Sequence, residues 1–123
     1  MDVSMQDTQN QLVDNRELLN ALIKSLQVGN RKLAKAEHDY RLAYAKECIK
    51  IKIDGAEGEK GKTDPVAWTM TPTIARGNKE VASCRYERDI MQGEVEAIMQ
   101  KIYAVKLEIN ILQKELEAIT YGQ

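Results

Sequence analysis

The residues that could do chemistry in this chain are few and scattered. One histidine, His38, stands between Glu37 and Asp39, and two cysteines, Cys48 and Cys84, lie far apart in the chain. A zinc site needs several cysteine or histidine ligands at close spacing, and this arrangement offers none. We therefore expect no metal, with His38 on a solvated helix face and both cysteines as thiols that pack like small apolar side chains.

Two other patterns could suggest catalysis. Glu94 with Glu96 and Glu115 with Glu117 form pairs of carboxylates that could exchange protons, and the run Gly61–Thr63 resembles the end of a phosphate-binding loop. The carboxylates repeat as the exposed face of a coiled coil does, and the glycines before the run have the wrong spacing for such a loop. Catalysis also needs polar groups that converge in a concave pocket, so we expect neither an enzyme nor a cofactor.

Composition favours long helices over a globular core. The 123 residues include 30% charged and 5% aromatic side chains, no phenylalanine, and a net charge of -1. No apolar run approaches the roughly 20 residues that span a bilayer, and the polar N-terminal stretch has no features of a signal peptide. The sequence therefore predicts a cytoplasmic protein whose thiols stay reduced.

Apolar residues recur in steps of three and four along the second half of the chain. These are Val81, Cys84, Met91, Val95, Ile98, Ile102, Val105, Ile109, Leu112, Leu116 and Ile119, with Arg88 as the one break. Upstream, a seven-residue repeat comprises Leu12, Leu19, Leu26, Leu33 and Tyr40. These stripes predict an all-α, antiparallel two-helix hairpin of the coiled-coil type, as one domain over 1–123. The helices are expected at about 7–53 and 78–119, joined by the connector 54–77.

The connector has its own local signals. The polar, glycine-rich segment Asp54–Thr63 predicts a mobile loop, and no alternating β-branched pattern predicts hairpin strands there. Thr71 is expected to cap a short helical turn that has Pro72 at its first position and ends at Gly77. Asn78 is then expected to cap the second long helix.

Antiparallel pairing of the two stripes suggests one register. It places Gly29 opposite Ile102 and Arg88 opposite Ala43, where the guanidinium could reach Glu47. In this register the two cysteines lie near each other at the connector end.

The second helix carries another apolar stripe, on the side opposite the first. It comprises Tyr86, Ile90, Ala97, Tyr103, Ala104, Leu107 and Ile111. In a monomer this stripe would face water, so we expect a homo-oligomer, a dimer or tetramer, in which second helices pack back to back within a helical bundle. The alternative is that Trp68 and the segment Pro65–Ile74 fold back over the stripe.

Basic residues gather around the middle of the chain. Those that could contact phosphates are Arg31, Lys32, Lys35, Arg41 and Lys46. Tyr40 and Tyr44 lie between them and could stack on bases. A solvated helix face explains the same pattern, and the sequence favours it over nucleic-acid contact because there is no recognition motif.

Three stretches of this sequence resemble small α-helical hairpin proteins encoded in phage and prophage gene clusters of Gram-positive bacteria. They are AEHDYRLAYAKE, TPTIARGN and YERDIMQGEVEAIMQKIYAVKLEINILQKELE. The resemblance implies a small non-enzymatic accessory protein in the host cytoplasm that self-associates and binds an unidentified protein partner, as an adaptor, scaffold or host modulator. Because such genes can neighbour replication and recombination genes, accessory DNA binding is the alternative. A prefoldin-like chaperone holder is the third.

Overall fold

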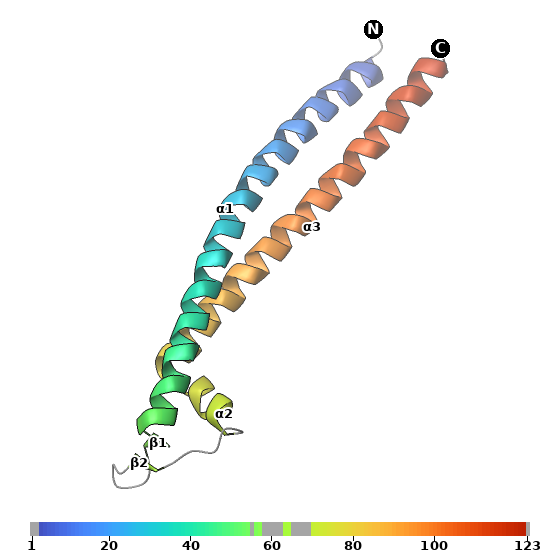
Figure 1. Ribbon diagram of the computed structural model, residues 1–123. Coiled ribbons are helices and arrows are strands. Elements are labelled where there is room, and N and C mark those ends of the chain that lie inside the picture. Colours follow the sequence, from blue (N-terminus) through green and yellow to red (C-terminus); the bar gives the residue numbers. More distant parts are fainter. Residues whose placement is uncertain (1–2, 55, 58–62, 65–69, 123) are drawn as a thin grey trace. The chain divides into compact units, whose positions relative to one another are not determined.

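The structure, a computed structural model, describes residues 3–54, 56–57, 63–64 and 70–122. Two long helices dominate it: α1 (Val3–Asp54) and α3 (Lys79–Tyr121), with the short α2 (Thr71–Arg76) between them in the chain (Figure 1). The predicted all-α helical hairpin is therefore confirmed. α1 begins at Val3 rather than at about residue 7, and α3 continues through Tyr121 rather than ending at about 119.

The predicted cap of α3 is present. Asn78 Oδ1 accepts hydrogen bonds from the backbone N–H groups of Glu80 at 2.9 Å and Val81 at 3.2 Å. These are two of the donors that the first turn of a helix leaves without a partner inside the helix. The side chain of Asn78 therefore fixes where α3 begins.

The predicted cap of α2 is wrong by one residue. Met70 occupies the N-cap position and makes no side-chain capping bond, whereas Thr71 lies inside the helix and is only 2% exposed. Thr71 is therefore a buried residue of the first turn of α2 rather than its N-cap. The expected end is confirmed, since Gly77 is the C-cap and donates its N–H to the carbonyl of Ile74 at 3.1 Å.

The connector contains two short strands that the sequence did not predict. Strand β1 (Ala56–Glu57) pairs antiparallel with β2 (Thr63–Asp64), with Ala56 opposite Asp64. Two residues per strand are too few to show an alternating pattern, which explains the wrong expectation. The expectations of a mobile loop at 54–63 and of a covering role for Trp68 fall largely on residues 55, 58–62 and 65–69, outside the described part.

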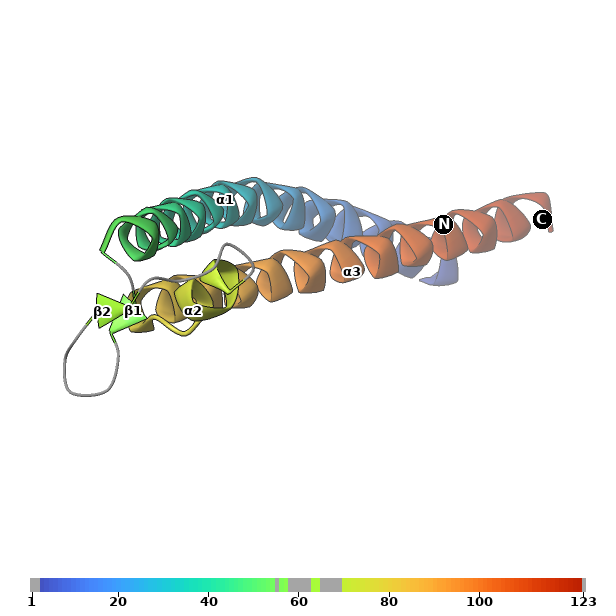
Figure 2. The same ribbon diagram turned by 60° about the horizontal axis from the view of Figure 1, so that its bottom comes forward.

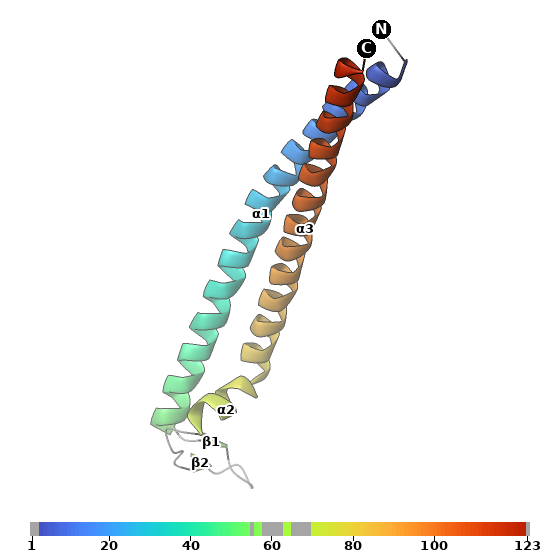
Figure 3. The ribbon, with the colours of Figure 1, turned by 90° about the vertical axis from the view of Figure 1, so that its right-hand side faces the viewer.

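The chain forms two compact units, and the first contains Met1–Asn30 and Glu94–Gln123. In Figures 1 and 3 the blue part of α1 runs beside the orange-to-red part of α3. The buried apolar side chains of this unit are Leu12, Val95, Ile102, Val105 and Leu112. A Cβ atom on Gly29 would lie 3.2 Å from Val95 Cγ2 and 3.8 Å from Ile98 Cδ1. Glycine therefore lets the two helices approach closely at this point.

The second unit contains residues 31–93. Figure 2 shows α2 and the strands where α1 ends and α3 begins. Its most buried side chains are Ile51, Thr71, Ala75 and Val81, each at most 3% exposed. The short helix α2 is thus an integral part of the core of this unit.

The predicted stripes are the buried faces of the long helices, because every member of both is buried or half-buried. Asn15 interrupts the stripe of α1 and is half-buried, and its Nδ2 donates to the carbonyl of Gln11 at 2.8 Å. Its amide group is therefore hydrogen-bonded within its own helix rather than across to α3.

The predicted register is wrong by about one helical turn. Gly29 lies against Val95 and Ile98 rather than Ile102, and the Arg88 guanidinium lies against Tyr40 and Glu37. A seven-residue repeat buries nearly the same apolar side chains after a slip of one turn, so burial alone does not choose between the registers.

Candidate interaction surfaces

The outer stripe of α3 is open to solvent. This name refers to Tyr86, Ile90, Ala97, Tyr103, Ala104, Leu107 and Ile111, all of which are exposed. Among them Tyr103 is 66% and Leu107 59% exposed. Large apolar side chains in a regular row on the side of a helix away from its buried face are typical of a protein contact.

Small residues run through this surface. Gly93 lies between Ile90 and Ala97 in the same row, and among the described residues nothing comes within 4 Å of the position that its Cβ would occupy. A glycine inside a helix costs about 1 kcal/mol relative to alanine, and no contact within the described chain compensates this cost. Together with Ala97 and Ala104, Gly93 would let another helix approach closely.

Carboxylates border the outer stripe. On one edge Glu94, Glu108 and Glu115 follow the helical repeat, with Lys101 as the exception, and on the other edge lies Glu117. All five side chains are exposed. One edge of the surface is therefore mainly acidic, whereas the other carries both signs, because Lys106 is exposed on the same side of the helix as Glu117, and Lys114 is exposed beside Ile111.

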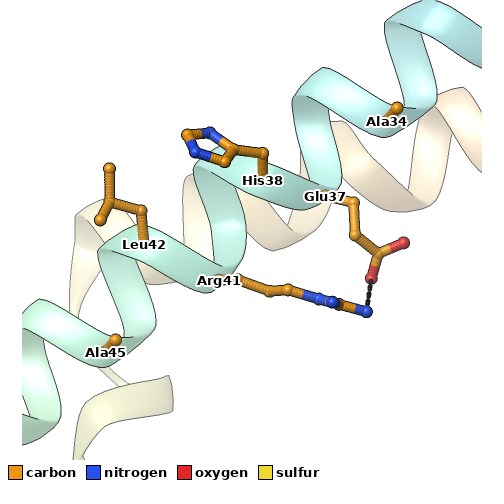
Figure 4. Close-up of a pocket in the computed structure, with 6 residues that line it drawn as sticks. All are labelled: Ala34, Glu37, His38, Arg41, Leu42 and Ala45. Atoms are coloured by element: carbon orange, nitrogen blue, oxygen red, sulfur yellow. Dashed lines mark ion pairs between the residues drawn. The ribbon is translucent and has the colours of Figure 1, made fainter.

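The opposite charge lies on α1. The predicted basic residues Arg31, Lys32, Lys35, Arg41 and Lys46 are all exposed on this one helix. Beside them is a hollow of about 420 Å³, lined by Ala34, Glu37, His38, Arg41, Leu42 and Ala45 (Figure 4). All six residues come from α1, so the hollow is a shallow depression between side chains along one helix. It lacks the enclosure that a catalytic site needs.

The two tyrosines of this region do not belong to the basic surface. Tyr40 and Tyr44 stack on each other, with ring centres 6.1 Å apart and planes inclined by 24°. The guanidinium of Arg88 lies 4.6 Å from the Tyr40 ring centre, and that of Arg76 lies 6.0 Å from the Tyr44 ring centre. Arginines of α2 and α3 therefore lie over these rings, and base stacking by Tyr40 and Tyr44 stays a prediction.

The guanidinium of Arg88 contacts Asp89 and Glu37 as well as the ring of Tyr40. Its guanidinium donates to Asp89 Oδ1 at 2.9 Å and lies 3.9 Å from Glu37 Oε1. The hydrogen bond with Asp89 raises the pKa of Arg88, and the charges of Asp89 and Glu37 act in the same direction. The sequence located the break in the stripe at Arg88 but not its contact with Tyr40, which depends on the register.

Two further groups among the described residues, Cys84 and Tyr44, have raised pKa values. Burial, followed by the charges of Glu80, Asp39 and Glu87, raises the pKa of the Cys84 thiol, which keeps it protonated and unreactive near neutral pH. Burial and a hydrogen bond with Cys48 raise the pKa of Tyr44. Both cysteines are free, and their predicted proximity stays a prediction.

His38 lies where the sequence placed it. Its side chain is 73% exposed, and Nδ1 lies 3.5 Å from Asp39 Oδ1. Within the described ranges, no three histidine, cysteine or acidic side chains are grouped so that they could hold a metal ion. None of the described helices is long and apolar enough to cross a bilayer.

Comparison with known proteins identifies no relative, since the chain matches no protein-family model, no curated protein and no solved structure.

Proposed function

We propose that this protein is a non-enzymatic helical hairpin that self-associates through the outer stripe of α3 and serves as an adaptor or scaffold for a protein partner. The observation that carries the proposal is that α3 has two apolar faces, of which one is buried and the other exposed. The buried face packs within the chain. The exposed face has the length and the residue spacing of a second helix-packing surface.

The exposed face is large enough to support association. Ile90, Tyr103, Leu107 and Ile111 each retain between 39% and 66% of their accessible surface. Fully burying a side chain of this kind contributes about 1.5–3 kcal/mol, so burying the part still exposed contributes on the order of 1 kcal/mol for each residue. Gly93 and the alanines between these residues would let the partner helix come close enough for this burial.

DNA binding is less well supported. The basic residues of α1 are exposed, but Tyr40 and Tyr44 stack on each other and on Arg88 and Arg76. Contacts to phosphates would then have no base stacking beside them. Among the described residues the strands β1 and β2 have two residues each, which is too short for a sheet surface that could bind DNA. Adaptor function therefore agrees better with the surfaces that the chain exposes.

Sedimentation equilibrium tests the proposal. We expect wild-type protein at tens of micromolar to have a mass above that of the 13.9 kDa chain. Leu107→Glu and Ile111→Glu together should return it to a monomer with unchanged helix content by circular dichroism. The matched control is Val13→Glu, at a 52% exposed apolar position on α1. A monomeric wild type, or equal effects of the control and the double variant, would contradict the proposal.

A further inference from the structure

We propose that the outer face of α1 binds the surface of an anionic lipid bilayer. The outer face is the side of α1 that points away from Tyr40 and Ile51, over residues 31–53. A helix bound in this way lies along the membrane interface and does not cross it. The contact uses α1 rather than the outer stripe of α3, so it is a further function beside the proposed self-association.

Three large apolar side chains follow one line along the outer face. Leu42, Ile49 and Ile53 are 45%, 59% and 76% exposed, so the exposed fraction increases toward the end of the helix. Steps of seven and four residues place them within roughly 40° of one another around the helix axis. Ile51, on the opposite side, is only 3% exposed. The row is therefore apolar surface that packing within this unit leaves open.

Basic side chains surround this apolar row. The exposed ones on the outer face are Arg31, Lys32, Lys35, Lys46 and Lys50. Within residues 31–53, all of them described, Asp39 is the one acid on this face, and its Oδ1 lies 3.5 Å from His38 Nδ1. Glu37 and Glu47 are half-buried and lie toward the opposite side, and Asp54 is turned by about 100° from Ile53. The outer face therefore has a strong excess of positive charge.

The other elements of this unit pack on the opposite side of α1. Arg88 of α3 lies over the Tyr40 ring and Arg76 of α2 over the Tyr44 ring, and both tyrosines point away from Leu42. Figure 4 shows the same division, with His38 and Leu42 projecting from one side of α1 and Glu37 from another. A flat surface can therefore approach the outer face without displacing the contacts of α2 and α3.

The combination of charge and exposed aliphatic side chains distinguishes a bilayer from other anionic partners. Aliphatic residues with lysines beside them are typical of helices that lie in a membrane interface. The apolar stems of lysine and arginine extend beside such residues and place their cations at the level of the lipid phosphates.

Two other kinds of partner fit the outer face less well. Contacts to the phosphates of a nucleic acid would gain nothing from the exposed side chain of Ile53. A packing helix of another protein would meet Arg31 and Lys35 in line with the apolar row, where it needs apolar side chains.

Co-sedimentation of the full chain with lipid vesicles tests the inference. Wild type should bind phosphatidylcholine vesicles with about 30% phosphatidylserine at least tenfold more tightly than pure phosphatidylcholine vesicles, and salt should weaken this binding. Lys46→Glu with Lys50→Glu should weaken it by at least about tenfold. Ile49→Ser with Ile53→Ser should weaken it by about tenfold without any change of charge. Because all four side chains are exposed, helix content by circular dichroism should stay unchanged.

Two matched variants control for charge and for apolar surface in general. Lys101→Glu with Lys106→Glu makes the same charge change on exposed residues of α3. Leu18→Ser with Ile23→Ser removes side chains that are 47% and 38% exposed on other sides of α1. Both variants should bind the vesicles as wild type does.

The outcomes that overturn the inference are distinct. Absence of vesicle binding by wild type overturns it, as does equal binding with and without phosphatidylserine. If binding depends on Lys46 and Lys50 but not on the two isoleucines, and a short DNA duplex binds more tightly than the vesicles, the outer face binds nucleic acid instead. A monomeric wild type would remove the proposed self-association and leave this inference standing, because the outer face belongs to α1.

Discussion

The guanidinium of Arg88 lies over the ring of Tyr40, 4.6 Å from its centre, in the seam between α1 and α3 of the second unit. Arg88 is the one charged residue in the buried stripe of α3, and its side chain is 22% exposed. A cation over an aromatic face is attracted by the ring, and the stem of the arginine packs against apolar neighbours. A position that breaks the apolar pattern is thus a contact between the helices.

Replacing this arginine should therefore destabilise the hairpin. We expect Arg88→Ala to lower the free energy of unfolding by about 1–2 kcal/mol, through loss of the ring contact and of stem packing. Urea denaturation measures this, and a double-mutant cycle with Tyr40→Leu should give a coupling of about 0.5–1 kcal/mol. Arg41→Ala is the control, because Arg41 also pairs with Glu37 but is 76% exposed, and it should change stability by less than about 0.5 kcal/mol. Zero coupling would mean that the ring and the guanidinium do not interact in solution.

The two glycines of the long helices should respond differently to alanine. Gly93→Ala should stabilise the chain by about 1 kcal/mol, because its Cβ enters open space and alanine favours the helix. Gly29→Ala should gain clearly less, or lose stability, because its Cβ would lie 3.2 Å from Cγ2 of Val95, a buried and stiff side chain. Thermal unfolding at low protein concentration compares them. Equal shifts in melting temperature would show that the close approach at Gly29 is absent.

The cap of α3 makes a third prediction. Asn78→Ala should cost about 1 kcal/mol, since two backbone donors lose the side-chain oxygen that accepts their hydrogen bonds. Asn78→Asp should retain the stability, because a carboxylate accepts the same bonds and interacts favourably with the helix N-terminus. Asn110→Ala, at an exposed position inside α3, is the matched control. Chemical denaturation of the three variants checks the ranking, and a similar loss for Asn110→Ala would argue against a capping role.

Alkaline pH should weaken the fold through Cys84. Burial raises the pKa of this thiol above its usual value of 9.0, so the unfolded chain releases the proton at a lower pH than the folded chain. This contribution is fully present below pH 9 and is lost as the pH rises toward the folded pKa. Stability measured from pH 8 upward should fall, and Cys84→Ser should make the fall shallower than in wild type. An unchanged slope in the variant would assign the effect to other groups, such as Tyr44.

The sequence predicted the helices because the residues that pack between them are apolar and recur every three or four positions. Each apolar residue from Val81 to Ile119 in the stripe of α3 is buried or half-buried, and Asn78 caps the helix as expected. The register was not predictable in the same way, because a slip of one turn keeps apolar residues opposite apolar residues. What distinguishes the registers is the fit of Gly29 against Val95 and of Arg88 against Tyr40, and these are contacts between distant parts of the chain.

The candidate surfaces were predictable to different degrees. The outer stripe of α3 and the basic residues of α1 are exposed where the helical repeat placed them, since position on a helix follows directly from spacing. The roles of Tyr40 and Tyr44 were not predictable, because they depend on Arg88 and Arg76 reaching their rings from other elements. The residues of β1 and β2 show no sequence pattern that predicts strands.

The nested order of contacts around the connector has a consequence for how the chain folds. The pairing of β1 with β2 closes a very short loop, the contact of Tyr44 with Arg76 closes a longer one, and that of Gly29 with Val95 a longer one still. The entropy lost on closing a loop grows with its length, but only by about 0.6 kcal/mol for each doubling. Each contact formed near the connector therefore shortens the loop that the next contact must close. Packing of α1 against α3 should begin at the connector and extend toward the termini. Amide hydrogens at the terminal ends of α1 and α3 should exchange first.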